Sequence, residues 1–157
     1  MSPSDQVNHD TVLSKNRLRL WLKLLKASRL IEDEIRRRLR SDCQLTLPRF
    51  DVMSTLSQSP DGLKMSEISK QLRVSNGNVT GIVDRLADEG LAVRSAVQGD
   101  RRAYLVRLTP EGRRVFDAHA IAHEGWIDEM LSGFNDDDVQ GMIVRLEHLT
   151  QTLDKES

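Results

Sequence analysis

The sequence predicts a mainly helical protein that carries one small β-hairpin. Three observations lead to this fold class. Apolar residues recur at three- and four-residue steps over most of the chain. Two short amphipathic helices are separated by only a tight turn. Two β-prone runs with a short polar connection follow those helices directly. The 157 residues are enough for one domain with its own core, which we expect to span residues 14–155.

Composition narrows the class of protein. Residues 1–12 are polar and are expected to be flexible, and the start of the chain lacks the basic and apolar regions of a signal peptide. No apolar run approaches the roughly 20 residues of a membrane span. A single cysteine, Cys43, excludes an internal disulfide and is typical of a reducing compartment. We therefore expect a cytoplasmic protein with no membrane partner.

The net charge of −1 hides a strong asymmetry along the chain. Residues 14–42 carry a net charge of +6 and residues 63–109 carry +3, whereas residues 110–157 carry −7. Such a distribution favours one surface that faces an anionic partner and another that is turned away from it.

The first predicted helix runs from about 14 to 41 and, at 1.5 Å per residue, is about 40 Å long. A helix longer than a small globule needs commonly pairs with a second chain. Thr46 and Pro48 mark the start of a second helix, and residues 60–62 form a turn after it. A short extended segment (63–65) follows, and Ser66 is the expected N-cap of a third helix that ends near residue 73.

The fourth helix, in SNGNVTGIVDRLADEG (75–90), has Ser75 as its N-cap and Gly90 as its C-terminal stop. Its apolar residues have the spacing of an amphipathic helix. Gly77 and Gly81 lie four residues apart on one face, and each costs about 1 kcal/mol of helix stability relative to alanine. Such a face suggests close approach of another molecule to the helix backbone.

The runs 91–97 and 103–109 predict a hairpin with the five-residue tip QGDRR. Thr109 and Pro110 then begin a helix that runs to about residue 132. Asn135 and three aspartates begin the last helix, where acidic residues favour the helix dipole. Its apolar residues form one seam along the helix, made of Val139, Met142, Ile143, Leu146, Leu149 and Leu153.

A helix-turn-helix followed by a hairpin with a basic tip is the winged-helix arrangement. The glycine face can press against a nucleic-acid strand in the major groove, while neighbouring polar side chains reach phosphates and base edges. An arginine on a thin hairpin can enter the minor groove. The alternative is that the glycines and their polar neighbours are merely small solvated positions. It is less favoured, because a hairpin with a basic tip follows the helix and the segment carries net positive charge.

The segments VSNGNVTGIVDRLADEGLAVR (74–94) and GDRRAYLVRLTPEG (99–112) resemble the MarR-type winged helix-turn-helix transcriptional regulators. In the second segment, Asp-x-Arg stands at the hairpin tip and Leu-Thr-Pro-x-Gly opens the next helix. The resemblance covers nearly all of residues 14–155. It implies a DNA-binding lobe over 46–109 and a helical dimerisation region made of 14–42 and 110–155.

The resemblance also implies a homodimer on an inverted-repeat operator of double-stranded DNA, usually a repressor released by a small aromatic effector. By position, Asp100 pairs with Arg85 to brace the hairpin, although Arg85 contacting phosphate, Asp88 or Glu89 is an equal alternative. Arg102 is then the groove probe and Arg101 a phosphate contact. The residues expected to contact DNA are Ser66, Ser75, Asn76, Gly77, Asn78, Thr80, Gly81, Arg85, Arg94, Asp100, Arg101 and Arg102.

The family layout suggests a ligand cleft, although core packing is the commoner role of its apolar candidates. A branch of the family that answers to aromatic acyl-CoA thioesters resembles LPRFDVMSTL and SNGNVTGIVDRL, and arginines on one helix face would hold the phosphates. A solvated basic face is the alternative. The ligand-binding candidates are Trp21, Leu24, Leu25, Arg29, Arg36, Arg40, Phe50, Met53 and Met65.

Other functions have weaker support in the sequence. His119 and His123 have a permitted metal-ligand spacing, but a third ligand is missing, so we expect an exposed helix face and no metal. Cys43 as a redox sensor and a winged helix used for protein contacts are further alternatives. An enzyme is not expected, because no nucleotide loop, triad or metal cage is present, and neither is a cofactor.

Overall fold

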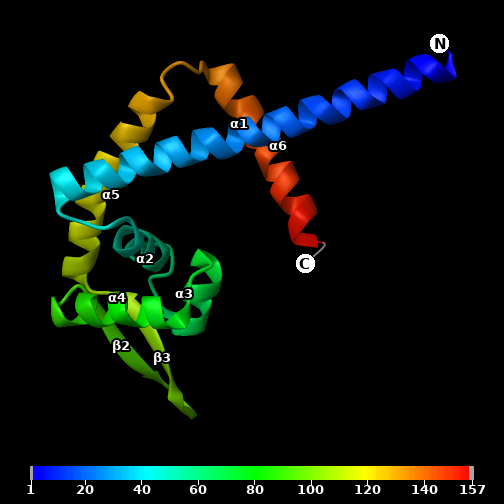
Figure 1. Ribbon diagram of the computed structural model, residues 1–157. Coiled ribbons are helices and arrows are strands. Elements are labelled where there is room, and N and C mark those ends of the chain that lie inside the picture. Colours follow the sequence, from blue (N-terminus) through cyan, green and yellow to red (C-terminus); the bar gives the residue numbers. More distant parts are fainter. Residues whose placement is uncertain (1, 156–157) are drawn as a thin grey trace. The chain divides into compact units, whose positions relative to one another are not determined.

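The computed structural model describes residues 2–155, apart from the side chains of Arg101 and Arg102 (Figure 1). The chain divides into two compact units, one up to Ala120 and one from Ile121 onward. The elements, in chain order, are α1 (Pro3–Cys43), α2 (Leu47–Ser57), β1 (Leu63–Lys64), α3 (Met65–Leu72), α4 (Asn76–Asp88), β2 (Ala92–Val97), β3 (Asp100–Leu108), α5 (Pro110–Met130) and α6 (Asp136–Lys155). The mainly helical fold with a small hairpin is confirmed. No helix among the described residues is long and apolar enough to cross a membrane.

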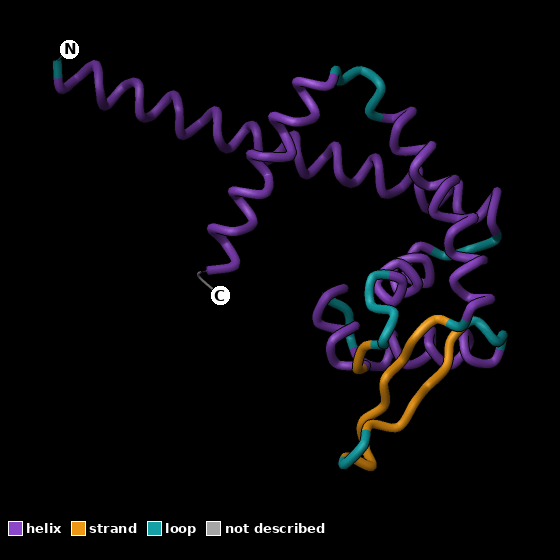
Figure 2. Tube along the Cα trace, turned by 180° about the vertical axis from the view of Figure 1, so that it is seen from behind, coloured by secondary structure: helices purple, strands orange, loops and turns teal. Residues whose placement is uncertain are grey.

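Three strands form one antiparallel sheet in the order β1-β3-β2 (Figure 2). The central strand β3 pairs through Val106 with Leu63 of β1 and with Arg94 of β2. Val106 is fully buried, so the middle of the sheet lies against the helices while the far end of the β2–β3 hairpin projects away from them (Figure 2). The extended segment at residues 63–64 is thus the third strand of the wing.

The core of the first unit lies between α2, α3, α4 and the sheet. Its fully buried side chains come from each of these elements and from the end of α1, and the largest are Leu39, Val52, Met53, Leu56, Ile68, Val79, Val83, Leu86 and Val106. Phe50 of α2 and Phe116 of α5 add an aromatic pair with ring centroids 5.5 Å apart. The amphipathic spacing expected of the fourth helix is thus confirmed by the burial of Val79, Val83 and Leu86.

The expected start of the first helix near residue 14 is wrong, because α1 begins at Pro3. Ser2 and Asp5 form a capping box: the Ser2 backbone N–H and hydroxyl both donate to Asp5 Oδ2, over 3.3 and 2.9 Å. Pro3 at the first helical position loses no intrahelical hydrogen bond. Residues 3–12 are thus polar and helical, and their polarity hid the helix.

Two further boundaries differ from expectation. Lys64, not Ser66, is the N-cap of α3, and Met65 opens the helix because β1 leads straight into it. The hairpin tip is a two-residue turn at Gln98 and Gly99, since Val97 pairs with Asp100. Gly99 adopts a φ of +87°, which makes so tight a turn accessible. The basic residues 101–102 belong to β3 and not to a loop, and the pairing register shifts opposite them, between Ala96 and Val97.

In the second unit, α6 begins with reciprocal capping: Asn135 Oδ1 accepts from the Asp138 N–H (2.9 Å), and the Asn135 N–H donates to Asp138 Oδ2 (3.2 Å). None of the described residues of α6 is buried in the single chain. Most of its apolar seam is therefore exposed in the single chain.

Candidate nucleic-acid interface

Helix α4 is held by its apolar face and leaves the opposite face open. Val79, Val83 and Leu86 are fully buried at the spacing of one helix side. Ser75 caps the N-terminus, where its hydroxyl oxygen accepts from the Asn78 N–H (3.4 Å). Gly90, with a φ of +74°, ends the helix as expected. The predicted bounds of this helix are thereby confirmed.

Gly77 and Gly81 lie on the open face of α4. A methyl group built at either glycine would meet no atom within 4 Å. Intramolecular packing therefore gives no reason for either glycine, although each weakens the helix by about 1 kcal/mol relative to alanine. Both also line a shallow hollow of about 260 Å³, together with Asn78, Ile82 and Arg85. We call this exposed face of α4, which carries no side chain at Gly77 and Gly81, the glycine ridge.

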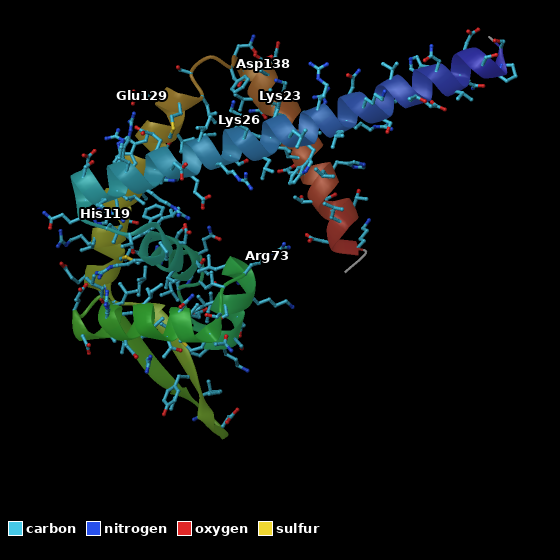
Figure 3. All side chains as sticks on the ribbon, in the orientation of Figure 1. Lys23, Lys26, Arg73, His119, Glu129 and Asp138 are labelled. Atoms are coloured by element: carbon cyan, nitrogen blue, oxygen red, sulfur yellow. The ribbon has the colours of Figure 1, made fainter. Side chains whose placement is uncertain are left out.

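The polar candidates around the ridge are exposed, as required for contact with another molecule. Asn76 and Asn78 present their amides from the first turn of α4, and Ser66 is exposed on α3. Thr80 is also exposed, but its hydroxyl donates to the Asn76 carbonyl (2.8 Å), so only its lone pairs are free for a partner. Arg73 lies at the end of α3, between the two helices (Figure 3), in a left-handed conformation with a φ of +54°.

Two ion pairs hold α4 to its neighbours. Arg49 of α2 donates to both carboxylate oxygens of Glu89, the C-cap of α4, with Nη1–Oε1 at 3.1 Å. This hydrogen bonding lowers the pKa of Glu89. Arg94 of β2 donates through Nη2 to Asp84 Oδ1 and so ties the hairpin to α4. No local pattern signals the first pair, because its members lie 40 residues apart.

The Arg94–Asp84 pair gives Arg94 a contact within the lobe. Its Nη2 pairs with Asp84 at the surface, where the Arg94 side chain is still 35% exposed, so its predicted contact with DNA stays a prediction. The pairing of Arg85 with Asp100 is not among the ion pairs that the structure describes, and it stays a prediction. Arg85 is exposed and lies close enough to Glu89 for its charge to lower the pKa of that carboxyl, which agrees with the alternative of an acidic neighbour.

A backbone clamp fixes the exit of α4 against the start of α5. Thr109 Oγ1 donates to the Gly90 carbonyl (2.7 Å) and accepts from the Gly112 N–H (3.0 Å). The Thr109 N–H donates to the Leu91 carbonyl (3.0 Å). A Cβ at Gly112 would stand 1.9 Å from that same carbonyl oxygen, so only glycine fits. Thr109 is thus confirmed as the N-cap of α5, and the Leu-Thr-Pro-x-Gly motif has a steric cause.

The hairpin supplies the remaining DNA-contact candidates. Asp100 is exposed and opens β3 directly after the turn. The side chains of Arg101 and Arg102 lie outside those that the structure describes, so their roles as phosphate contact and groove probe stay predictions. Their backbone positions in β3 place them in the projecting part of the hairpin.

The ligand-binding candidates fall into separate places. Phe50 and Met53 are core residues that are 5% and 0% exposed, and Met65 is partly buried at the start of α3. Trp21 is 55% exposed on α1. The structure does not gather these apolar candidates around one cavity. The candidates that remain are partly buried or exposed residues of α1, namely Leu24, Leu25, Arg29, Arg36 and Arg40.

A cavity of about 450 Å³ lies instead between α1, α2, the α3–α4 turn and α4. Of the predicted ligand residues it contains Arg36, and of the predicted DNA contacts it contains Asn78. Its other lining residues are Glu32, Leu47, Pro48, Asp51, Val52, Leu72, Val74 and Ile82. Sequence reasoning missed this set because it comes from four segments of the chain that no local pattern connects.

Metal and redox chemistry find little support. His119 (Figure 3) and His123 are partly buried, contrary to the expected exposed face, and desolvation lowers the pKa of each. No group of three or more possible ligands gathers for a metal among the described residues. Burial and the neighbouring Asp42 raise the pKa of the Cys43 thiol, which reduces the reactive thiolate.

Comparison with known proteins finds similarity to transcriptional regulators. The family model described as "MarR family" matches residues 45–104. A crystal structure of a MarR family transcriptional regulator from Silicibacter pomeroyi is 31% identical, covers 89% of this chain and 96% of that one, and has a TM-score of 0.72. The HTH-type transcriptional regulator MhqR of Bacillus subtilis is 26% identical over 82% of this chain and 87% of its own.

A more distant structure shares the fold alone. It is CouR from Rhodococcus jostii bound to p-coumaroyl-CoA, which is 20% identical, covers 83% of this chain and 90% of that one, and has a TM-score of 0.70. The relatives are named as transcriptional regulators, which agrees with the expectation that the chain is not an enzyme.

Proposed function

The chain belongs to the MarR family of transcriptional regulators, and from that premise we propose that it binds an inverted-repeat operator as a homodimer. In this proposal α4 lies in the major groove and the β2–β3 hairpin reaches the adjacent minor groove. The protein acts as a repressor that a small aromatic effector releases. Residues 46–109 form the DNA-binding lobe, and residues 14–42 and 110–155 form the dimerisation region.

The observation that carries this proposal is the open ridge at Gly77 and Gly81. A helix that keeps two destabilising glycines against empty space gains from them only when something outside the chain packs there. A duplex backbone is such a partner, because exposed amides and hydroxyls surround the ridge and can donate to phosphates. The buried face and the two ion pairs keep the ridge rigid, as base readout requires.

Fluorescence anisotropy with the promoter fragment beside the gene tests the proposal. We expect tight binding that weakens steeply with salt, because phosphate contacts release counterions. The Gly81→Leu variant should lose binding while retaining its circular dichroism spectrum and a melting temperature at least as high as that of the wild type. Gly125→Leu is the control for added bulk, since a methyl at this α5 glycine also meets no atom within 4 Å, and its dimer mass is measured as well because residue 125 lies in the proposed dimerisation region. Equal DNA affinity of Gly81→Leu and wild type would refute the proposal.

The dimer part of the proposal rests on apolar residues that the single chain leaves exposed. On α6, Met142, Leu146 and Leu153 are 45%, 46% and 55% exposed, and Leu18 and Leu22 of α1 are 57% and 54% exposed. The basic charge of residues 14–42 and the acidic charge of residues 110–157 favour pairing between two copies. Sedimentation equilibrium should give the dimer mass for the wild type and a lighter species for Leu146→Asp.

The effector part rests on the cavity and on two basic hollows beside it. Arg36 lines the cavity, and Arg36 and Arg40 line neighbouring hollows of about 580 and 300 Å³ on the α1 surface. An aromatic acyl-CoA would place its acyl part in the apolar cavity and its phosphates on these arginines. Isothermal titration calorimetry with aromatic acids and with their CoA thioesters tests this. Binding heat from the free acids, with none from the CoA thioesters, would contradict the proposal that the effector is a thioester.

A further inference from the structure

The cavity between α1, α2 and α4 has apolar walls and an asymmetric pair of carboxylates. Leu47, Val52 and Leu72 contribute apolar surface from α2 and α3. The two carboxylates are Glu32 on α1 and Asp51 on α2. With a volume of about 450 Å³, the cavity suits a molecule about the size of one substituted aromatic ring and a short chain.

The two carboxylates differ in what they contact. Glu32 Oε1 accepts a hydrogen bond from Arg36 Nη2 at 3.2 Å. Asp51 accepts no hydrogen bond from any group in the described part of the chain, and Arg36 acts on it only as a nearby positive charge. Partial burial, followed by the charge of Glu32, raises the pKa of Asp51. A partly buried carboxylate without a donor is costly, and a ligand can supply the donor.

We infer that Asp51 selects the ligand: the cavity takes an apolar molecule that carries a hydrogen-bond donor, a phenolic hydroxyl or a protonated amine, and rejects one that carries a carboxylate at that end. This inference names the ligand class of the proposed function, and it rests on that function where it expects the ligand to change DNA binding. It also separates free aromatic acids from their thioesters, because a thioester has lost the carboxylate charge and a ring hydroxyl can still reach Asp51.

The same cavity touches the proposed DNA-binding helix directly. Asn78 and Ile82 of α4 line it, and Asn78 is also one of the exposed amides beside the glycine ridge. A ligand held by Asp51 therefore contacts the flank of α4 that borders the hollow at Gly77 and Gly81, since Asn78 and Ile82 line both. Occupancy of the cavity can move α4 without any intervening element.

Four probes with one common body test the inference in the full-length protein: 4-ethylphenol, phenethylamine, 3-phenylpropionate and ethylbenzene. Calorimetry on the wild type should rank at least one of the two donors above both ethylbenzene and the carboxylate by about tenfold or more, the usual value of a hydrogen bond to a charged group. Asp51→Asn should abolish the preference for the amine and improve binding of the carboxylate. Asp61→Asn, an exposed carboxylate in the turn after α2, is the control and should change nothing.

The outcomes are distinct. A wild type that prefers 3-phenylpropionate, that binds no probe, or whose ranking survives Asp51→Asn overturns the inference. Operator binding is measured in parallel by anisotropy. Loss of operator binding by the wild type would refute the proposed regulator and leave the ligand ranking as a separate result, so the two failures cannot be confused.

Discussion

Gly112 offers a test of how the DNA-binding lobe is joined to α5. In Gly112→Ala, the new methyl would stand 1.9 Å from the Leu91 carbonyl oxygen and 2.8 Å from its carbon, so backbone has to move. That carbonyl accepts from the Thr109 N–H, and Thr109 also holds the Gly90 carbonyl. Losing two hydrogen bonds costs about 1 kcal/mol each. The displaced backbone adds about 1–3 kcal/mol, as in overpacked cores.

We therefore expect Gly112→Ala to lower the free energy of unfolding by about 3–5 kcal/mol. Urea denaturation at one fixed protein concentration measures this, because dimerisation would make stability depend on concentration. Gly125→Ala in the same helix is the control. It meets no atom within 4 Å and should be neutral or stabilising by roughly 0.5–1 kcal/mol. The reasoning is refuted if the two variants unfold at the same urea concentration.

Three further outcomes are expected. Gly81→Ala should raise the melting temperature, because alanine favours helix, and at the same time weaken operator binding; anisotropy and calorimetry on one sample check both. Arg94→Ala should weaken DNA binding no more than Asp84→Ala does and leave its salt dependence unchanged, whereas Arg102→Ala should reduce the slope of log affinity against log salt by about 1. Hydrogen bonds from Arg37 and Arg38 lower the pKa of Glu34 to about 2. The stability that Glu34 contributes should therefore be complete above its ordinary pKa and be lost as the pH falls through about 2. Carbon NMR of the Glu34 carboxyl checks that pKa.

Local signals in the sequence were sufficient for most of the fold. The helix starts at Thr46, Ser75 and Thr109 and the stop at Gly90 are where the sequence places them, because each is decided locally. Ser75 and Thr109 cap through their hydroxyls, Pro48 in the first turn marks the start after Thr46, and Gly90 adopts a positive φ. The start of α1, in contrast, was missed. Its capping box at Ser2 is also local, but the polar residues after it masked the helical pattern.

The candidate site could be predicted only in part. The glycine ridge is visible in the sequence because both glycines lie on one helix. The pair Arg49–Glu89 and the position of Asp51 in a cavity depend on contacts between helices, and nothing in the local pattern of either residue signals them. Phe50 and Met53 show the opposite error: their helical spacing fits a cleft wall and a core equally well, and the structure places them in the core.

The position of α4 bears on how an effector can act. Its inner face holds Val79 and Val83 in the core, Ile82 borders the cavity, and its outer face carries the ridge. A ligand can shift DNA binding only by its difference in affinity between a DNA-binding state and a released state of the protein, and about 5.5 kcal/mol is needed to move the population from 1:99 to 99:1. One new hydrogen bond to Asp51 supplies about 1.5–3 kcal/mol of that, so apolar contact with the cavity walls must supply the larger part. Effectors should therefore need both an apolar body that fills the cavity and a donor at one end, and a small polar molecule should leave the DNA complex intact.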